Sequence, residues 1–131
     1  MQVGAACTRV KDGQLEILLI TGRKSGRWVI PKGWQMKALS NGEAASIEAW
    51  EEAGVIDAAR SETPLGTYIS RKRLKDGTKA EVEVVVFHLK VKDASETYPE
   101  AKQRQRAWFS PTEAASHVRE PELKKILLDL T

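Results

Sequence analysis

Three glutamates in the middle of the chain, Glu48, Glu51 and Glu52, stand at spacings that a helix brings onto one face. Residues three and four apart on a helix are neighbours, so the three carboxylates would converge and repel one another. Hard divalent cations prefer such oxygen ligands, and Mg²⁺ or Mn²⁺ bound there would also gather the phosphate groups of a substrate. The alternative interpretation is a solvated acidic helix face with no ligand.

The flanking residues predict the helix that would present these carboxylates. Ser40, followed three residues later by Glu43, is the pattern of a capping box, which indicates a helix start. Gly54 is typical of a left-handed helix stop, so the helix is expected to run from Ser40 to Ala53. Its opposite face is expected to pack on a sheet through Ala49, Trp50 and Ala53.

The rest of the chain alternates between apolar strand patterns and turn signals, with no internal repeat and no low-complexity linker. Lys-Asp-Gly occurs at 11–13 and again at 75–77, where hairpin turns are expected. Pro111 and Pro121 are expected near the starts of two further helices. The expected strands cover residues 3–10, 15–22, 28–30, 65–73, 79–91 and 107–109.

Length and composition describe one ordinary domain. The 131 residues suffice for one core, and 41% hydrophobic with 30% charged residues is typical of a globular protein. The single cysteine, Cys7, leaves no partner for an intramolecular disulfide and fits a reducing compartment. No apolar run could span a bilayer and no signal-peptide pattern opens the chain, so we expect a cytoplasmic protein without a membrane partner. The net charge of +3 by itself implies no polyanionic partner.

The segment from Gly33 to Val55 (33–55) resembles the Nudix box of the Nudix (MutT-like) hydrolases. That box runs Gly, five residues, Glu, seven residues, then Arg-Glu-aliphatic-x-Glu-Glu-x-Gly-aliphatic. In one ungapped register the three glutamates, both glycines and Val55 match, whereas Leu39 and Ile47 stand where the pattern has Glu and Arg. Ala49 is a small residue at the aliphatic position. The flanking segments WVIPKG (28–33) and RAWFSPTEAA (106–115) resemble the branch that cleaves diphosphoinositol and diadenosine polyphosphates.

This resemblance implies an α+β fold, the Nudix α/β/α sandwich with a mixed β-sheet between helices, with residues 1–131 forming a single domain. It also implies a pyrophosphohydrolase in which a cation neutralises phosphate oxygens and lowers the pKa of the attacking water. Glu48 and Glu52 would bind the metal together with the backbone carbonyl of Lys32, and Glu51 would take the proton from water. All three glutamates are candidate metal ligands and catalytic residues, because the base differs within the superfamily.

Basic residues are expected to hold the phosphate groups, since guanidinium groups bind phosphate oxygens in bidentate fashion. By resemblance to the family, the substrate-binding candidates are Lys32, Gly33, Arg23, Arg27, Arg71, Arg73 and Arg104. Each basic cluster on its own is more typical of a solvated face. No aromatic residue interleaves the hairpin cluster at 71–73, so we do not expect nucleic-acid binding.

Several other residues could suggest chemistry. Trp34 follows Gly33 directly, and it is expected either to stack on a base or to pack on the sheet. His88 lies in an alternating strand, where a packed histidine is the expectation, and His117 is expected to be exposed near a helix end. The sequence shows no nucleophile elbow, so covalent catalysis has no support.

Two features separate the chain from the diphosphoinositol branch. That branch has a basic cluster before the first strand, where this chain has only Met1–Gly4, and it often has an acid where Ala107 precedes Trp108. An additional metal ligand from that region would have to be Glu100.

The two charged positions of the box that depart from the pattern, Leu39 and Ile47, are both apolar. In the family the two charges form an ion pair, and replacing both partners by packed apolar groups is often neutral or stabilising. We therefore interpret Leu39 and Ile47 as an apolar pair that braces the metal-binding loop. The alternative is drift in a domain that no longer needs the loop to be held.

Three functions are consistent with the sequence. The leading hypothesis is a Mg²⁺- or Mn²⁺-dependent pyrophosphohydrolase that acts, as a monomer or homodimer, on a dinucleoside polyphosphate or a diphosphoinositol polyphosphate. A second is a house-cleaning hydrolase of nucleoside triphosphates. A third is a catalytically impaired Nudix domain that binds a nucleotide or an RNA end. The three retained glutamates favour the enzymes, while Leu39, Ile47 and Ala107 keep the third function open.

Overall fold

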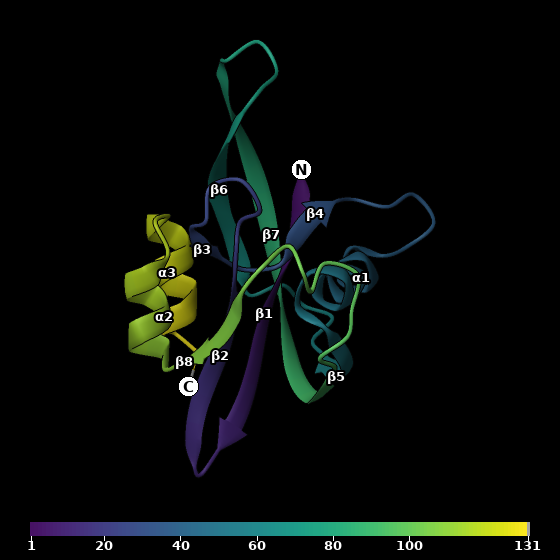
Figure 1. Ribbon diagram of the computed structural model, residues 1–131, viewed down its shortest axis with the longest axis vertical. Helices are drawn as coiled ribbons and strands as arrows, with labels where there is room; N and C mark the ends of the chain where they lie inside the picture. The colour runs from purple at the N-terminus through teal and green to yellow at the C-terminus, as the bar shows by residue number, and fades with distance from the viewer. Residues whose placement is uncertain (131) are drawn as a thin grey trace.

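The fold is a mixed β-sheet between helices, as Figure 1 shows for the computed structural model, which describes residues 1–130. Helix α1 (Asn41–Ala53) covers one face of the sheet, and helices α2 (Pro111–His117) and α3 (Pro121–Leu128) cover the other. The strands are β1 (Gln2–Lys11), β2 (Gln14–Thr21), β3 (Trp28–Val29), β4 (Lys32–Trp34), β5 (Val55–Arg60), β6 (Gly66–Arg73), β7 (Lys79–Ala94) and β8 (Arg106–Phe109). The predicted α/β/α sandwich is therefore confirmed.

Strand β1 lies in the middle of the sheet and joins its two cores. It pairs in parallel with β7 and antiparallel with β2 and β4, which makes the sheet mixed. Successive side chains point to opposite faces, so Val3, Ala5 and Cys7 pack in the core under α1 while Ala6 packs in the core under α2 and α3. Burial on both faces explains why this strand is almost continuously apolar.

Helix α1 begins and ends where the sequence predicts. The Ser40 hydroxyl accepts a hydrogen bond from the Glu43 amide, the Glu43 carboxylate accepts one from the Ser40 amide, and Gly54 has a φ of 77°. The helix is held on the sheet by small residues that are completely buried, Ala44, Ala45, Ala49 and Ala53.

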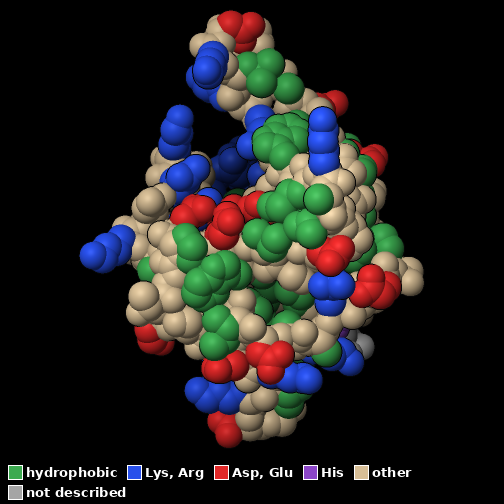
Figure 2. Space-filling view, turned by 90° about the vertical axis from the view of Figure 1, so that its right-hand side faces the viewer, with side chains coloured by type: hydrophobic (Ala, Val, Ile, Leu, Met, Phe, Trp, Pro, Cys, Tyr) green, Lys and Arg blue, Asp and Glu red, His purple; other side chains and the backbone are tan. Residues whose placement is uncertain are grey.

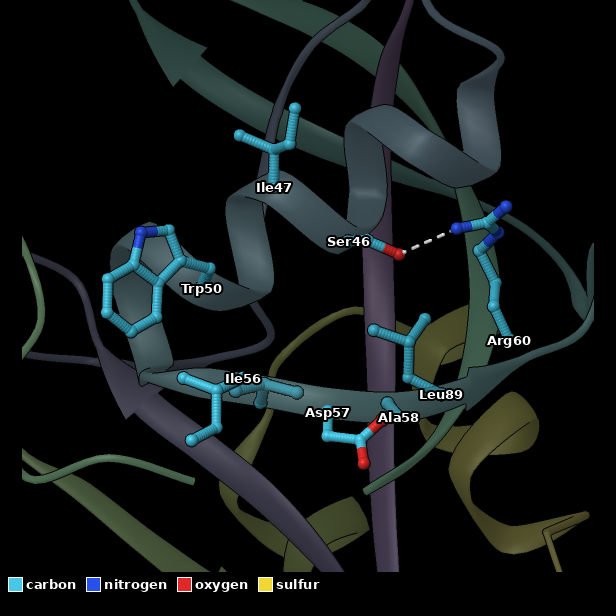
Figure 3. Close-up of a pocket in the computed structure, with 9 residues that line it drawn as sticks. Ser46, Ile47, Trp50, Ile56, Asp57, Ala58, Arg60 and Leu89 are labelled. Atoms are coloured by element: carbon cyan, nitrogen blue, oxygen red, sulfur yellow. Dashed lines mark hydrogen bonds between the residues drawn. The ribbon is translucent and has the colours of Figure 1, made fainter. Parts of the chain in front are cut away.

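The prediction that Trp50 packs on the sheet is wrong. Its position on the helix turns it to one side, where it is only half-buried and borders a groove of about 440 Å³ between α1 and β5. Figure 3 shows Trp50 and Ile56 on the two sides of this groove, and Ser46 hydrogen-bonded to Arg60 at 3.1 Å.

Strands β4 and β5 were not predicted from the sequence. In β4, Lys32 and Trp34 pair with Gly4 and Gln2 of β1. Strand β5 follows Gly54 and pairs with the C-terminal half of β7, with an irregular register near its start. Both strands form because a distant strand offers hydrogen-bonding partners, which a local sequence pattern does not reveal.

The remaining elements follow the prediction. Turns at 11–13 and 75–77 close the two hairpins, with Gly13 and Gly77 at φ values of 77° and 88°. The end of the β6–β7 hairpin projects from the body of the molecule as a two-stranded arm (Figure 1). Within residues 1–130, no helix combines the length and the apolar character that crossing a membrane requires.

Candidate active site

The carboxyl groups of Glu48 and Glu52 lie together where α1 meets β4. The two residues are one helical turn apart, are only 9% and 7% exposed, and are joined by a side-chain hydrogen bond. Strand β4 comes this close because Gly33 has no side chain: a Cβ atom at Gly33 would collide with the Glu48 carboxyl group. The structure thus brings three sequence-predicted residues together.

The electrostatics of this carboxyl pair favour a proton or a cation between the two groups. Burial, the hydrogen bond with Glu52 and the negative charge of Glu52 raise the pKa of Glu48 to about 8. Burial also raises the pKa of Glu52, although the hydrogen bond with Glu48 and the positive charge of Arg104 oppose this. Because two ionised carboxylates are costly here, a bound divalent cation would replace the shared proton.

The available donors fit a hard divalent cation. Glu48 and Glu52 offer oxygen atoms side by side, and Glu51 lies next to them in sequence and is half-exposed. Within residues 1–130, no three acidic, histidine or cysteine side chains are gathered into a complete metal cluster. Mg²⁺ is commonly held by one or two carboxylates together with water and substrate phosphates, so a partial set of protein ligands suits it.

Lys32 contacts the site through its backbone. Its amide donates a hydrogen bond to Glu52 Oε1 at 3.2 Å, which ties β4 to α1. Side chains alternate along a strand, so the Lys32 side chain lies on the opposite face of the sheet from the missing Gly33 side chain. There its ammonium donates to Gln2 Oε1 at 3.3 Å, and Gln2 is only 2% exposed. Burial and the charge of Lys72 lower the pKa of Lys32.

Arg104 reaches the carboxyl pair from the segment before β8. Its guanidinium lies 3.6 Å from Glu52, bonds to Glu100 at 2.9 Å, and donates to the backbone carbonyl of Thr21 at 2.9 Å. Its side chain is only 9% exposed. Arg104 is therefore placed at the predicted site, where its charge stabilises the ionised form of Glu52; its contact with a phosphate group stays a prediction.

The segment between β7 and β8, together with Arg106 at the start of β8, also closes the C-terminal end of α1. The amides of Glu100 and Ser95 donate to the carbonyls of Glu51 and Gly54 at 3.0 and 2.7 Å, and Arg106 donates to the Ala53 carbonyl at 2.7 Å. These bonds satisfy carbonyl groups that a helix end leaves without partners. They also hold the Glu100 carboxylate near the site, where its charge contributes to the raised pKa of Glu48.

The other predicted phosphate-binding residues lie farther from the carboxyl pair. Arg71 is exposed and pairs with Glu81 at 3.3 Å on the β6–β7 arm, and Arg73 is exposed two residues later on the same strand face. Arg23 lies 3.7 Å from Glu100, and Arg27 lies in the same loop before β3. Figure 2 shows Lys and Arg side chains in the depth of a hollow beside a group of Asp and Glu side chains.

Sequence reasoning named Lys72 within the 71–73 cluster without selecting it as a site residue, and it gave no role to Gln2. Tyr68 and Ser70 are buried, so Lys72 continues that face of β6, and its charge acts on Lys32 across the sheet. The alternation of β6 is the signal that could have separated Lys72 from Arg71 and Arg73. Nothing in the sequence distinguishes Gln2 from any polar residue at a strand start.

The two histidines have structural positions, as expected. His88 Nε2 lies 2.8 Å from the Thr8 hydroxyl within the sheet. His117 is exposed at the end of α2, where Nδ1 lies 2.7 Å from the Glu113 carbonyl. Neither histidine is hydrogen-bonded to Glu48 or Glu52.

The two residues of the predicted apolar brace, Leu39 and Ile47, lie in different surroundings. Ile47 borders the groove between α1 and β5 with Trp50 and Ile56, while Leu39 is half-buried in the segment before α1 and does not line that groove. A contact between Leu39 and Ile47 therefore stays a prediction.

Comparisons with known proteins agree with this geometry. The NUDIX domain family model matches residues 1–130. The protein named Nudix hydrolase 17, mitochondrial, from Arabidopsis thaliana is 34% identical over 115 residues, which are 87% of this chain and 60% of that protein. The chain thus spans less than two thirds of that relative, whose name places it in mitochondria; a cytoplasmic location for this chain stays a prediction.

Solved structures share the fold. A binary complex of Ap4A hydrolase from C. elegans superposes with a TM-score of 0.71 and 21% identity, covering 97% of this chain and 91% of that chain. The NUDIX domain of Shewanella oneidensis NrtR, complexed with ADP-ribose, gives a TM-score of 0.65 and 15% identity over 98% of this chain and 85% of that chain. At these identities the similarity concerns the fold alone.

Proposed function

The chain belongs to the NUDIX domain family, and from this premise we propose that it is a divalent-metal-dependent pyrophosphohydrolase. The proposed reaction cleaves a phosphoanhydride bond in a dinucleoside polyphosphate or a diphosphoinositol polyphosphate. The observation that carries the proposal is the nearly buried carboxyl pair of Glu48 and Glu52 against Gly33. A purely structural helix face would gain nothing from holding two acids in so little water.

Different residues of the chain would bind the metal and accept the proton. Glu48, Glu52 and the Lys32 carbonyl would hold Mg²⁺ or Mn²⁺, with Glu51 as a further candidate ligand. When bound, the cation supplies charge neutralisation at phosphate oxygens and eases the deprotonation of water. Glu51, half-exposed beside the buried pair, accepts the proton of the attacking water.

Basic residues would position the phosphate chain. Among these basic residues Lys32 lies nearest to the carboxyl pair, because its amide is hydrogen-bonded to Glu52. Arg104 favours the ionised form of Glu52 and could offer its guanidinium to the phosphate beside the carboxylates. Arg23, Arg27, Arg71 and Arg73, which lie farther out, are proposed to contact the outer phosphates.

The test is a panel of substrates with the purified chain. Phosphate or nucleotide release is measured for diadenosine tetraphosphate, a diphosphoinositol polyphosphate, a nucleoside triphosphate and capped RNA, each with Mg²⁺, with Mn²⁺ and with EDTA. The proposal expects the first or second substrate to be cleaved fastest, and only with a divalent cation. Preferred cleavage of the triphosphate would support the house-cleaning hydrolase, and binding of nucleotide without turnover of any substrate would support the impaired domain.

A further inference from the structure

Trp34 is a large aromatic residue that the fold leaves 55% exposed at the end of β4. Its backbone pairs with Gln2 of β1, so the strand holds it in a fixed position rather than on a free loop. The sequence allowed Trp34 either to pack on the sheet or to stack on a ligand, and packing in the sheet's core is excluded by this exposure. Within residues 1–130, Trp34 is the most exposed of the tryptophans.

Two residues of strand separate Trp34 from Lys32, whose amide is hydrogen-bonded to Glu52. Lys32 hydrogen-bonds to Glu52 through its amide, and Trp34 follows Lys32 on the same strand face because side chains alternate. Two residues of β-strand span about 6–7 Å, since each residue rises about 3.3 Å. In a nucleotide, a ribose spans a similar distance, so a phosphate group beside Lys32 would leave the base beside Trp34.

Two lysine side chains lie near Trp34. The Lys72 ammonium lies 5.6 Å from the centre of the Trp34 ring, and Lys72 also acts electrostatically on Lys32. Within residues 1–130, neither Lys32 nor Lys72 forms a salt bridge with an acid. Because two positive charges close together repel each other, an anionic ligand beside Lys32 and Lys72 would be stabilising.

Three features define the ligand: the exposed Trp34 ring, the two lysines, and the strand distance between Lys32 and Trp34. A ligand that fits them carries phosphate groups at one end and a flat aromatic group at the other. A nucleotide has both, whereas an inositol polyphosphate has phosphates but no aromatic ring for the indole to contact. Stacking on an aromatic side chain suits any base, because every base has a π-face.

We propose that Trp34, with Lys72 against its ring, is the platform on which the base of a nucleoside polyphosphate stacks. The site therefore selects nucleotides over diphosphoinositol polyphosphates. This inference rests on the proposed function and narrows its substrate class. Trp34 acts on substrate choice, and the reacting phosphate stays at the carboxyl pair.

Binding of two non-hydrolysable probes tests the platform without turnover. Calorimetry with Mg²⁺ compares α,β-methylene-ADP with methylenediphosphonate, which has the same bridged phosphates and no base. The variants are Trp34→Leu, which removes the ring, and Trp34→Phe, which keeps one. The matched control is Trp50→Leu, because Trp50 lies in the groove on the other side of α1 and is placed in no binding role.

Trp34→Leu should weaken binding of α,β-methylene-ADP by about tenfold, the size of one base–aromatic stack, and should leave methylenediphosphonate binding nearly unchanged. Trp34→Phe should retain most of the affinity, and Trp50→Leu should retain all of it. Circular dichroism and thermal unfolding of each variant confirm that the fold is kept. Equal losses for both probes, or no loss for either, would overturn the platform.

The outcome separates this inference from the proposed function. If the wild-type chain cleaves diadenosine tetraphosphate while Trp34→Leu binds α,β-methylene-ADP as tightly as the wild type, the hydrolase stands and the platform is wrong. If the chain cleaves no substrate while Trp34→Leu loses base-dependent binding, the platform stands and the proposed catalysis is wrong.

Discussion

The backbone amide of Lys32 donates a hydrogen bond of 3.2 Å to the Glu52 carboxylate, which joins the short strand β4 to helix α1 at the proposed metal ligand. The bond forms because β4 is fixed on β1 through the pairing of Lys32 with Gly4. The strand therefore positions both the proposed metal-binding carboxyl groups and Trp34, and changes in β4 should affect binding and catalysis together.

Adding a side chain at Gly33 should damage the site. A Cβ there would collide with the Glu48 carboxyl group. Gly33→Ala is expected to destabilise the protein by about 1–3 kcal/mol, as overpacking does, and to lower kcat/KM strongly. Urea unfolding and substrate hydrolysis measure the two effects.

A second substitution checks the cause. Glu48→Asp withdraws the carboxyl group by one methylene, so Gly33→Ala with Glu48→Asp should recover part of the lost stability without recovering activity. A Gly33→Ala variant that matches the wild type in both assays would show that β4 and Glu48 do not approach this closely.

The metal-free protein should lose stability as pH rises from about 5 to about 8. The pKa of Glu48 is raised from its ordinary 4.5 to about 8, so the folded state keeps a proton that the unfolded chain releases. Since the folded state then binds more protons, the free energy of unfolding falls with pH across this window and levels off above it.

Urea unfolding in EDTA across this pH range measures the slope. Glu48→Gln should flatten it because the titrating group is gone, and saturating Mg²⁺ should reduce it because a cation takes the place of the proton. The same slope in Glu48→Gln as in the wild type would assign the effect to other groups.

Arg104 should matter far more for stability than Arg71. The Arg104 and Glu52 side chains are 9% and 10% exposed, and removing one partner of a buried ion pair costs about 3–5 kcal/mol. Arg104→Ala should approach that loss in chemical unfolding, and Arg104→Lys should recover part of it. Arg71→Ala is the matched control: the Arg71–Glu81 pair is exposed, so the expected cost is about 1 kcal/mol or less. Similar losses for both variants would contradict the network around Arg104.

Among the basic residues of β6, Lys72 should affect KM more than Arg71 and Arg73, which are proposed to contact only the outer phosphates. Only Lys72 lies on the face whose charge reaches Lys32. Lys72→Ala is expected to raise KM for a polyphosphate with little change in kcat, since a contact made equally in the ground and transition states has that signature. Steady-state kinetics of the three alanine variants decides, and a larger KM effect at Arg71 or Arg73 would restore the assignment made from the sequence.

Local signals predicted helix α1 well and the strands around it less well. The capping box at Ser40 and the stop at Gly54 are determined by neighbours in sequence, so both ends of α1 were predictable. Strands β4 and β5 depend on pairing with β1 and β7, which lie far away in the sequence.

The candidate site divides in the same way. Helical spacing was enough to place Glu48 beside Glu52, because both lie on one element. The burial of Arg104 against Glu52, and the position of Lys72 near Lys32, depend on how separate elements pack. A contact between Leu39 and Ile47 also depends on packing, and a double-mutant cycle with Leu39→Glu and Ile47→Arg remains its test.

Glu52→Gln tests the central claim most directly, because it removes one ligand charge while keeping the size of a side chain that is already nearly buried. The substitution should lower kcat/KM by about a hundredfold or more, beyond the ~10–100-fold effect typical of residues that only support a metal ligand. It should also weaken Mn²⁺ binding in calorimetry, with the fold intact by circular dichroism. Glu122→Gln, which removes an exposed charge on α3, is the control and should behave as the wild type. Activity of Glu52→Gln close to that of the wild type at saturating Mg²⁺ would contradict the proposed active site.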